Sequence, residues 1–161
     1  MNRKKPILHL IHGFVGAGKT TFAKRLEQET GAVRFTLDEW MIHFYGSNPP
    51  EGLFQEYLER VEGMIWKMIG QFLQREQDVI FDQGFWTRVE RDEARAKAAA
   101  WGATARLYAL QCPDDVTRSR VLKRTADMPP GAMFIDENAI ALFRTRFEPL
   151  GLDEEAVVVS S

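Results

Sequence analysis

The hydrophobic and polar positions of the chain alternate between short apolar runs and longer stretches in which apolar residues recur every three to four positions. The short runs predict strands at residues 7–11, 33–37, 79–82, 105–111 and 156–159. The periodic stretches predict helices at residues 20–29, 53–75, 87–101, 113–124 and 136–147, with a short helix or turn at 38–45. Strands that alternate with helices predict an α/β fold, in which helices cover both faces of a parallel sheet.

Local signals mark several ends of these helices. Thr87 and Glu90 have the spacing of a capping box, and Asp136 can cap the last helix. Pro113 stands where a first helical residue is expected. Between the last two helices, residues 125–135 include a Pro-Pro-Gly sequence, which predicts a loop.

One stretch fits a phosphate-binding motif at every fixed position. The pattern G-x-x-x-x-G-K-S/T is matched by Gly13-Phe14-Val15-Gly16-Ala17-Gly18-Lys19-Thr20, between a predicted strand and a predicted helix. Glycines let successive backbone N–H groups point at phosphate oxygens, and the helix N-terminus adds partial positive charge. The lysine can reach the β- and γ-phosphates, and the threonine hydroxyl can bind Mg²⁺. We therefore predict an ATP site formed by Gly13, Val15, Gly16, Ala17, Gly18, Lys19, Thr20 and Thr21.

Two aspartates follow predicted strands. Ligands of parallel sheets bind at the carboxyl ends of the strands, so we expect Asp38 and Asp82 to lie near the triphosphate. Asp38 could accept a proton from an attacking hydroxyl, and Asp82 could hold Mg²⁺ through water. Either aspartate could instead cap a helix or stabilise a turn.

Basic residues gather on both sides of the predicted loop, and we expect a lid at about residues 125–137. Phosphoryl transfer needs positive charge to offset the charge on the transferred group. Arg120 and Arg124 are four residues apart and share a helix face, which makes them candidates beside Lys19. They could equally be solvated charges at a helix end. A second set of arginines shares a helix face and fits surface ion pairs nearly as well: Arg88, Arg91 and Arg95.

A group of aromatic residues comes just after the two aspartates. They could line an apolar substrate pocket or belong to the core: Trp40, Phe44, Tyr45, Phe85 and Trp86. The three histidines lack the spacing of metal ligands, and Cys112 fits a buried small residue.

Composition narrows the class of protein. A length of 161 residues fits a single domain over 1–161, and 45% hydrophobic with 27% charged residues is ordinary for a globular chain. A net charge of −2 disfavours nucleic acid as a partner. One cysteine allows neither an internal disulfide nor a cysteine-based zinc site. No apolar run approaches the ~20 residues of a membrane helix, and the N-terminal residues do not resemble a signal peptide. We expect a cytoplasmic protein without a membrane partner, as a monomer or homodimer.

The chain resembles the small phosphate-loop kinases, in the branch of chloramphenicol phosphotransferase-like, zeta-toxin-like, gluconate-kinase-like and shikimate-kinase-like proteins. The similar segments are the phosphate-binding motif, Thr36-Leu37-Asp38-Glu39, residues 79–84 and residues 120–124. The resemblance implies a P-loop NTPase three-layer sandwich, a parallel sheet of about five strands with a small lid. It also implies that Asp38 handles the substrate hydroxyl. Residues 85–88 depart from the Asp-Gly-x-Pro-Arg pattern of nucleoside-monophosphate kinases, which argues against a nucleotide acceptor.

These features favour an ATP- and Mg²⁺-dependent kinase of a small hydroxylated compound. Because no basic cluster lies between Asp38 and Gln55, we expect a neutral or cationic alcohol with an apolar part. One alternative is a nucleotide-dependent switch or ATPase, although no guanine-binding Asn/Thr-Lys-x-Asp segment occurs. Another is a polynucleotide end kinase, which the weakly acidic charge disfavours.

Overall fold

The computed structural model of the chain describes residues 3–160. Within this range, the strands are β1 (Ile7–His12), β2 (Val33–Thr36), β3 (Val79–Gly84), β4 (Thr104–Gln111) and β5 (Val157–Ser160). The helices are α1 (Lys19–Thr30), α2 (Leu37–Tyr45), α3 (Glu51–Gln74), α4 (Arg88–Ala100), α5 (Asp114–Asp127) and α6 (Glu137–Arg146). All strand pairs are parallel, in the order β2-β3-β1-β4-β5. The predicted α/β fold with a five-stranded parallel sheet is confirmed.

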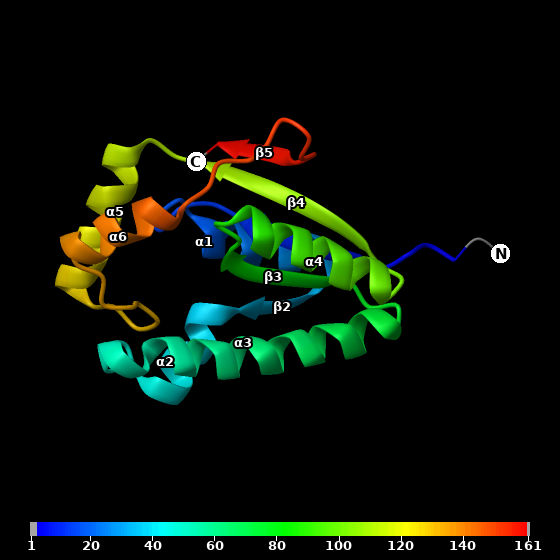
Figure 1. Ribbon diagram of the computed structural model, residues 1–161, viewed down its shortest axis with the longest axis horizontal. Coiled ribbons are helices and arrows are strands. Elements are labelled where there is room, and N and C mark those ends of the chain that lie inside the picture. The colour runs from blue at the N-terminus through cyan, green and yellow to red at the C-terminus, as the bar shows by residue number, and fades with distance from the viewer. Residues whose placement is uncertain (1–2, 161) are drawn as a thin grey trace.

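The central strand β1 is buried along its whole length and separates two hydrophobic layers. On one face, Leu8 and Leu10 belong to a cluster that includes Ile65 of α3 and Ala94 of α4. On the other face, Ile11 packs in a cluster with Ala23 of α1. Figure 1 shows α5 and α6 beyond the carboxyl ends of the strands, at the same end of the molecule as α2. The helices that could cover a ligand therefore lie at the edge of the sheet where parallel sheets bind ligands.

Two of the strand boundaries that differ from the sequence prediction bear on the aspartates. β2 ends at Thr36, because Leu37 already begins α2 and buries its side chain in the core. Asp38 therefore stands in the first turn of a helix, where the helix dipole favours negative charge. β3 continues to Gly84, since a register shift at the end of β1 pairs His12 with Gly84. Asp82 consequently lies inside a strand, buried between its neighbours, and not after it.

The helix before the predicted loop extends further toward its C-terminus than its apolar pattern predicted. α5 runs to Asp127 and ends at Met128, whose φ of 41° stops the helix. The connection between α5 and α6 is therefore residues 128–136, and Asp136 caps α6 by accepting from the Ala139 amide at 2.8 Å. No helix in the described part of the chain is long and apolar enough to cross a membrane.

Candidate active site

The phosphate-binding motif forms the turn between β1 and α1, as its sequence predicted. Gly16 has a φ of 79°, and a Cβ there would lie 2.6 Å from the Thr117 carbonyl oxygen and 2.8 Å from the Val121 side chain. Only glycine fits this position, because the turn packs directly against α5. The backbone N–H groups at the start of α1 have no side-chain cap among the described residues. An uncapped helix N-terminus of this kind attracts phosphate.

Lys19 lies at the centre of the site. Its Nζ donates to the Phe14 carbonyl oxygen at 2.9 Å, so the lysine folds back over its own loop. Burial lowers the pKa of Lys19, while the nearby carboxylates of Asp82 and Asp38 raise it. The lysine is therefore a positive charge shared between the loop and two acidic groups.

Asp82 connects the motif to two neighbouring strands. Its Oδ2 accepts from the Thr20 hydroxyl at 2.7 Å and from the Thr36 hydroxyl at 3.1 Å. Burial raises the pKa of Asp82, and Lys19 together with the two hydroxyl donors opposes that shift. Arg34 donates in turn to the Thr36 hydroxyl. Thr36 is thus a residue of the site that the sequence analysis overlooked, although its place at the end of β2 was a signal for it.

Asp38 faces the same charges from α2. Its side chain is solvent-exposed although protein surrounds it on most sides, as expected for a carboxylate on the wall of a cleft. Desolvation by this surrounding protein raises the pKa of Asp38, and Lys19 lowers it as the strongest opposing charge. The site therefore combines a buried aspartate beside the motif with an accessible aspartate at the opening.

The oxygen atoms of Thr20 and Asp82 suit Mg²⁺. A hydroxyl and a carboxylate oxygen are hard ligands, and these two lie 2.7 Å apart. In residues 3–160, no three or more His, Cys, Asp or Glu side chains are grouped to hold a metal ion by themselves. Mg²⁺ in phosphate-transfer sites typically takes one or two protein ligands and substrate phosphates, so this small donor set fits it.

The arginines near the motif have different partners. Arg120 on α5 donates to the Gly16 carbonyl oxygen at 3.4 Å, and it contacts the half-buried Cys112. Arg124 is exposed on the same helix and close enough to Lys19 and Asp38 to shift the pKa of both. By contrast, Arg144 of α6 pairs with Asp114 at 2.7 Å. The structure thus brings both predicted arginines to the motif, and Arg124 also to Asp38.

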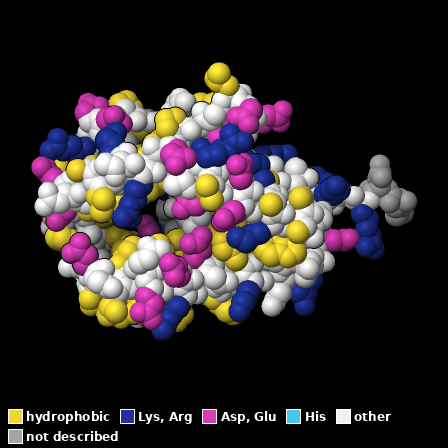
Figure 2. Space-filling model, viewed as in Figure 1, with side chains coloured by type: hydrophobic (Ala, Val, Ile, Leu, Met, Phe, Trp, Pro, Cys, Tyr) yellow, Lys and Arg dark blue, Asp and Glu magenta, His cyan; other side chains and the backbone are white. Residues whose placement is uncertain are grey.

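The connection 128–136 reaches the opposite side of the site. The Phe134 amide donates to the Ser47 carbonyl oxygen at 3.0 Å, so this loop touches the α2–α3 connection. Figure 2 shows a hollow between the part of the molecule that carries α5 and α6 and the part that carries α2. The contact therefore bridges the two walls of this hollow.

The aromatic residues that follow the aspartates separate into three places. Trp40, Phe44 and Tyr45 line an apolar hollow of about 200 Å³ beside α3. Phe85 is buried in the core, and Trp86 lies under the phosphate-binding loop. The pocket alternative therefore fits the three aromatic residues of α2, whereas the core alternative fits Phe85, because the turn after β3 directs its rings inward.

Of the remaining predicted residues, Gly18 ends the loop as the N-cap of α1, and Ala17 is buried within the turn. Val15 is half-buried, and Thr21 is exposed on α1. Val15 and Ala17 have apolar side chains, so only their backbone groups could meet phosphate.

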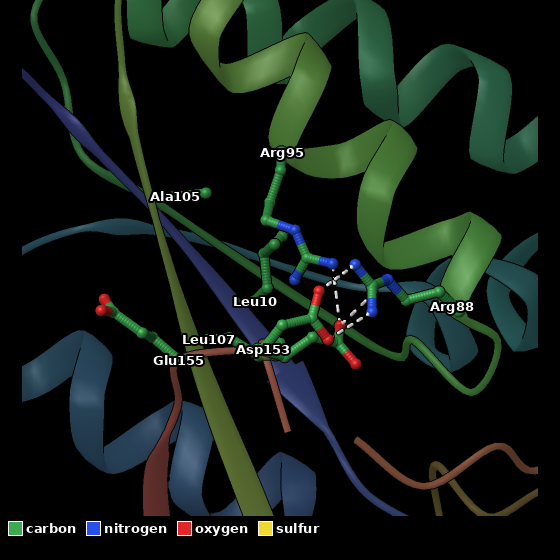
Figure 3. Close-up of a pocket in the computed structure, with 8 residues that line it drawn as sticks. Leu10, Arg88, Arg95, Ala105, Leu107, Asp153 and Glu155 are labelled. Carbon is green, nitrogen blue, oxygen red and sulfur yellow. Dashed lines mark hydrogen bonds and ion pairs between the residues drawn. The ribbon is translucent and has the colours of Figure 1, made fainter. Parts of the chain in front are cut away.

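A second cavity lies elsewhere, on the sheet face beside α4. It has a volume of about 300 Å³ and is lined by Leu10, Leu107 and charged side chains. Figure 3 shows Arg88 and Arg95 of α4 pointing toward Asp153 across this cavity. Because its charged residues pair with one another, we assign this cavity to structural ion pairs and not to the reaction.

Comparisons with known proteins agree with this geometry. A profile of the family described as AAA domain matches residues 8–150. No curated protein sequence matches the chain. The fold is similar to that of a candidate kinase from Chloroflexus aurantiacus, with a TM-score of 0.78 and 20% identity over 98% of this chain and 89% of that one.

Two further solved structures share the fold. A sugar kinase from a Janibacter species has a TM-score of 0.68 and 19% identity, over 98% of this chain and 86% of that one. A chain of an RNA repair complex has a TM-score of 0.74 and 22% identity, over 90% of this chain but only 45% of that one. Identities this low establish a common P-loop kinase fold and leave the substrate to be argued from the site.

Proposed function

The chain belongs to the family described as AAA domain and has the fold of small P-loop kinases, and from this premise we propose that it is an ATP- and Mg²⁺-dependent phosphotransferase acting on a hydroxyl of a small molecule. One observation carries the proposal. The motif lysine lies between a buried aspartate, which is bonded to the motif threonine, and an accessible aspartate on the cleft wall. A phosphotransferase needs this separation between a metal-binding carboxylate and one that can meet a second substrate.

The motif would hold the nucleotide through backbone N–H groups between Val15 and Thr21 and through Lys19, while Gly13 begins the turn. Thr20 and Asp82 would hold Mg²⁺, which neutralises charge on the phosphates when it is bound. Lys19 lies close enough to Asp38 and Asp82 for the charges to interact. Its ammonium group can therefore turn toward a phosphate and still keep positive charge near both carboxylates.

Asp38 would orient the acceptor hydroxyl and take its proton. A raised pKa makes this carboxylate a better proton acceptor than an ordinary surface aspartate. Arg124 would offset charge on the transferred group, because it is an exposed arginine whose charge acts on both Lys19 and Asp38. Arg120 would support the loop through the Gly16 carbonyl.

The acceptor would lie between Asp38 and the segment 40–57, which includes the rest of α2 and the start of α3. This region offers apolar surface from Trp40, Phe44 and Tyr45, and polar groups from Glu39 and His43. A neutral or cationic alcohol with an apolar part suits such a lining better than an anion. The segment 125–137 would form a lid over it in a single-domain enzyme of the cytoplasm, where ATP is available.

The test is ATP turnover with a panel of hydroxylated compounds, in which mass spectrometry follows the acceptor. A kinase should show ADP formation that an acceptor stimulates, and the acceptor should gain the mass of one phosphoryl group. Hydrolysis that no acceptor stimulates would contradict the proposal and favour a nucleotide-dependent switch.

The shared fold with a chain of an RNA repair complex makes a polynucleotide end kinase the second candidate. The net charge of −2 and the lack of a basic cluster between Asp38 and Gln55 weigh against it. Including an RNA with a 5′-hydroxyl end in the panel separates the two, since phosphorylation of that end would identify the second candidate.

A further inference from the structure

The end of β3 and the turn that follows it form hydrogen bonds with both backbone groups of Gly13, the first glycine of the phosphate-binding loop. The Gly13 amide donates to the Gly84 carbonyl oxygen at 3.2 Å. The indole Nε1–H of Trp86 donates to the Gly13 carbonyl oxygen at 2.9 Å. Gly84 permits this close approach, because its φ is 111° and a Cβ there would lie 2.9 Å from Trp86 Nε1. Both hydrogen-bonding groups of Gly13 are therefore fixed before any ligand arrives.

Trp86 also contacts the helix that follows the lid. Its ring lies 5.1 Å from the ring of Phe143 on α6 and 5.7 Å from the ring of Phe14 in the loop. Just beyond α6, Phe147 stacks on His12 at 5.0 Å. The indole of Trp86 thus contacts both the loop backbone and the C-terminal half of α6.

A buried ion pair holds the backbone of Trp86. Arg91 and Glu154 are 0% and 1% exposed and bond through two contacts, at 2.8 and 3.0 Å. The same guanidinium donates to the Trp86 carbonyl oxygen at 3.0 Å, and to that of Phe85 at 3.0 Å. Phe85 has a φ of 46°, a conformation that needs such outside support in a bulky residue. Two further ion pairs connect α4 to this part of the chain: Arg88 pairs with Asp153 and Arg95 pairs with Glu154 (Figure 3).

We propose that Trp86 is a positioning residue, which keeps the first peptide of the phosphate-binding loop in its ligand-ready conformation and couples that peptide to α6. The proposal rests on the proposed nucleotide site and adds a residue outside its motif. Gly13 is buried, so loss of the indole donor would leave its carbonyl without this partner and allow the peptide to turn. A loop that visits more conformations binds ATP more weakly, because only part of the population is competent.

The test compares Trp86→Phe with Trp101→Phe. Phenylalanine keeps a ring against Phe14 and Phe143 but lacks the N–H donor. Trp101 is also half-buried but caps the far end of α4, so its variant controls for the loss of an indole. We expect W86F to weaken ATP binding about five- to tenfold in calorimetry, the factor of one ordinary hydrogen bond. The KM for ATP should rise by a similar factor while kcat changes less. Binding within twofold of the wild type would overturn the proposal.

Amide exchange at residues 13–18 without nucleotide provides a readout that does not depend on activity. Exchange should be faster in W86F than in W101F, while exchange in β4 stays equal in the two variants. If the wild type binds no ATP, the proposed function fails, and this comparison still decides the role of Trp86. If W86F does not fold, the wild-type indole N–H of Trp86, assigned by elimination with W40F, W66F and W101F, should exchange slowly. An indole N–H that exchanges as fast as an exposed one would overturn the proposal.

Discussion

The two halves of the site are held very differently. The half under the phosphate-binding loop is fixed by Arg91, whose fully buried guanidinium bonds to Glu154 and to four carbonyl oxygens. The other half is the loop 128–136, which we propose covers the acceptor. It leaves Met128 and Phe134 exposed and bonds to Ser47 through a single backbone contact. The difference indicates that the nucleotide half is preorganised, whereas the acceptor half can open to admit a substrate.

The contrast between the two halves requires that the fixed half binds the nucleotide. Replacing Lys19 by Ala removes the charge that spans the β- and γ-phosphates, so ATP turnover should fall by at least ~10²–10³-fold. Lys24→Ala is the control, because Lys24 is an exposed residue of the same helix. Normal turnover in the K19A variant, measured as ADP formation, would exclude this loop as the active site.

The two aspartates should separate the halves by function. Asp38→Asn keeps the size of the side chain but removes its basicity, so transfer to the acceptor should fall by ~10²–10⁴-fold while nucleotide still binds. Asp82→Asn should instead weaken Mg²⁺-dependent nucleotide binding, because it alters the partner of Thr20. Calorimetry with ATP and a transfer assay would distinguish the two, and the reverse pattern would exchange their roles.

The rigidity of the fixed half can be broken at Arg91. Arg91→Met leaves Glu154 buried without its main partner, and such a loss costs about 3–5 kcal/mol of unfolding free energy. Arg91 also holds the pKa of Glu154 down at about 2, so this carboxylate stays charged in the native protein. The double variant Arg91→Met/Glu154→Leu should recover much of the loss. Urea denaturation measures all three proteins, and an R91M variant as stable as wild type would contradict the rigid half.

The sequence predicted the residues next to the proposed triphosphate site better than the residues that support them. The motif, Asp38, Asp82 and Arg124 were found because each stands at a recognisable place in an α/β pattern. The roles of Trp86 and Arg91 were not found, because they depend on a turn in which Phe85 adopts a positive φ and on a partner 63 residues away. Thr36 was missed because it meets Asp82 only through the parallel register of β2 with β3, which pairs residues 46 positions apart in the sequence.

The free energy of unfolding should depend on pH through His9 on the central strand β1. His9 is buried beside Tyr108, whose hydroxyl lies 2.8 Å from Nδ1, and its Nε2 has no hydrogen-bond partner in the described part of the chain. Burial lowers the pKa of His9 from 6.5 to about 4. Its neutral form therefore stabilises the fold fully above pH 6.5, and this contribution decreases as the pH falls toward 4.

Between pH 7 and 5 the loss from His9 should be about 2 kcal/mol of unfolding free energy. His9→Phe should remove this part of the slope, whereas His43→Gln, which alters an exposed histidine, should not. Urea denaturation at both pH values gives the difference. If the unfolding free energy changed equally between pH 7 and pH 5 in wild type and H9F, His9 would not be the cause of this pH dependence.

The smallest expected effect concerns the mobile half and sharpens the comparison most directly. In the free protein, residues 128–136 should exchange their amide hydrogens readily, because the bonds of Thr125 to Ile135 and of Phe134 to Ser47 are few and near the surface. With ATP and an acceptor bound, Arg124 gains an anionic partner at the base of this loop, so closure should slow exchange there by about tenfold. The amides of β1 serve as the internal control, because they pair with strands on both sides and should not change. Exchange in 128–136 that is equally slow with and without the ligands would mean that the two halves are equally rigid, and the loop would not be a lid.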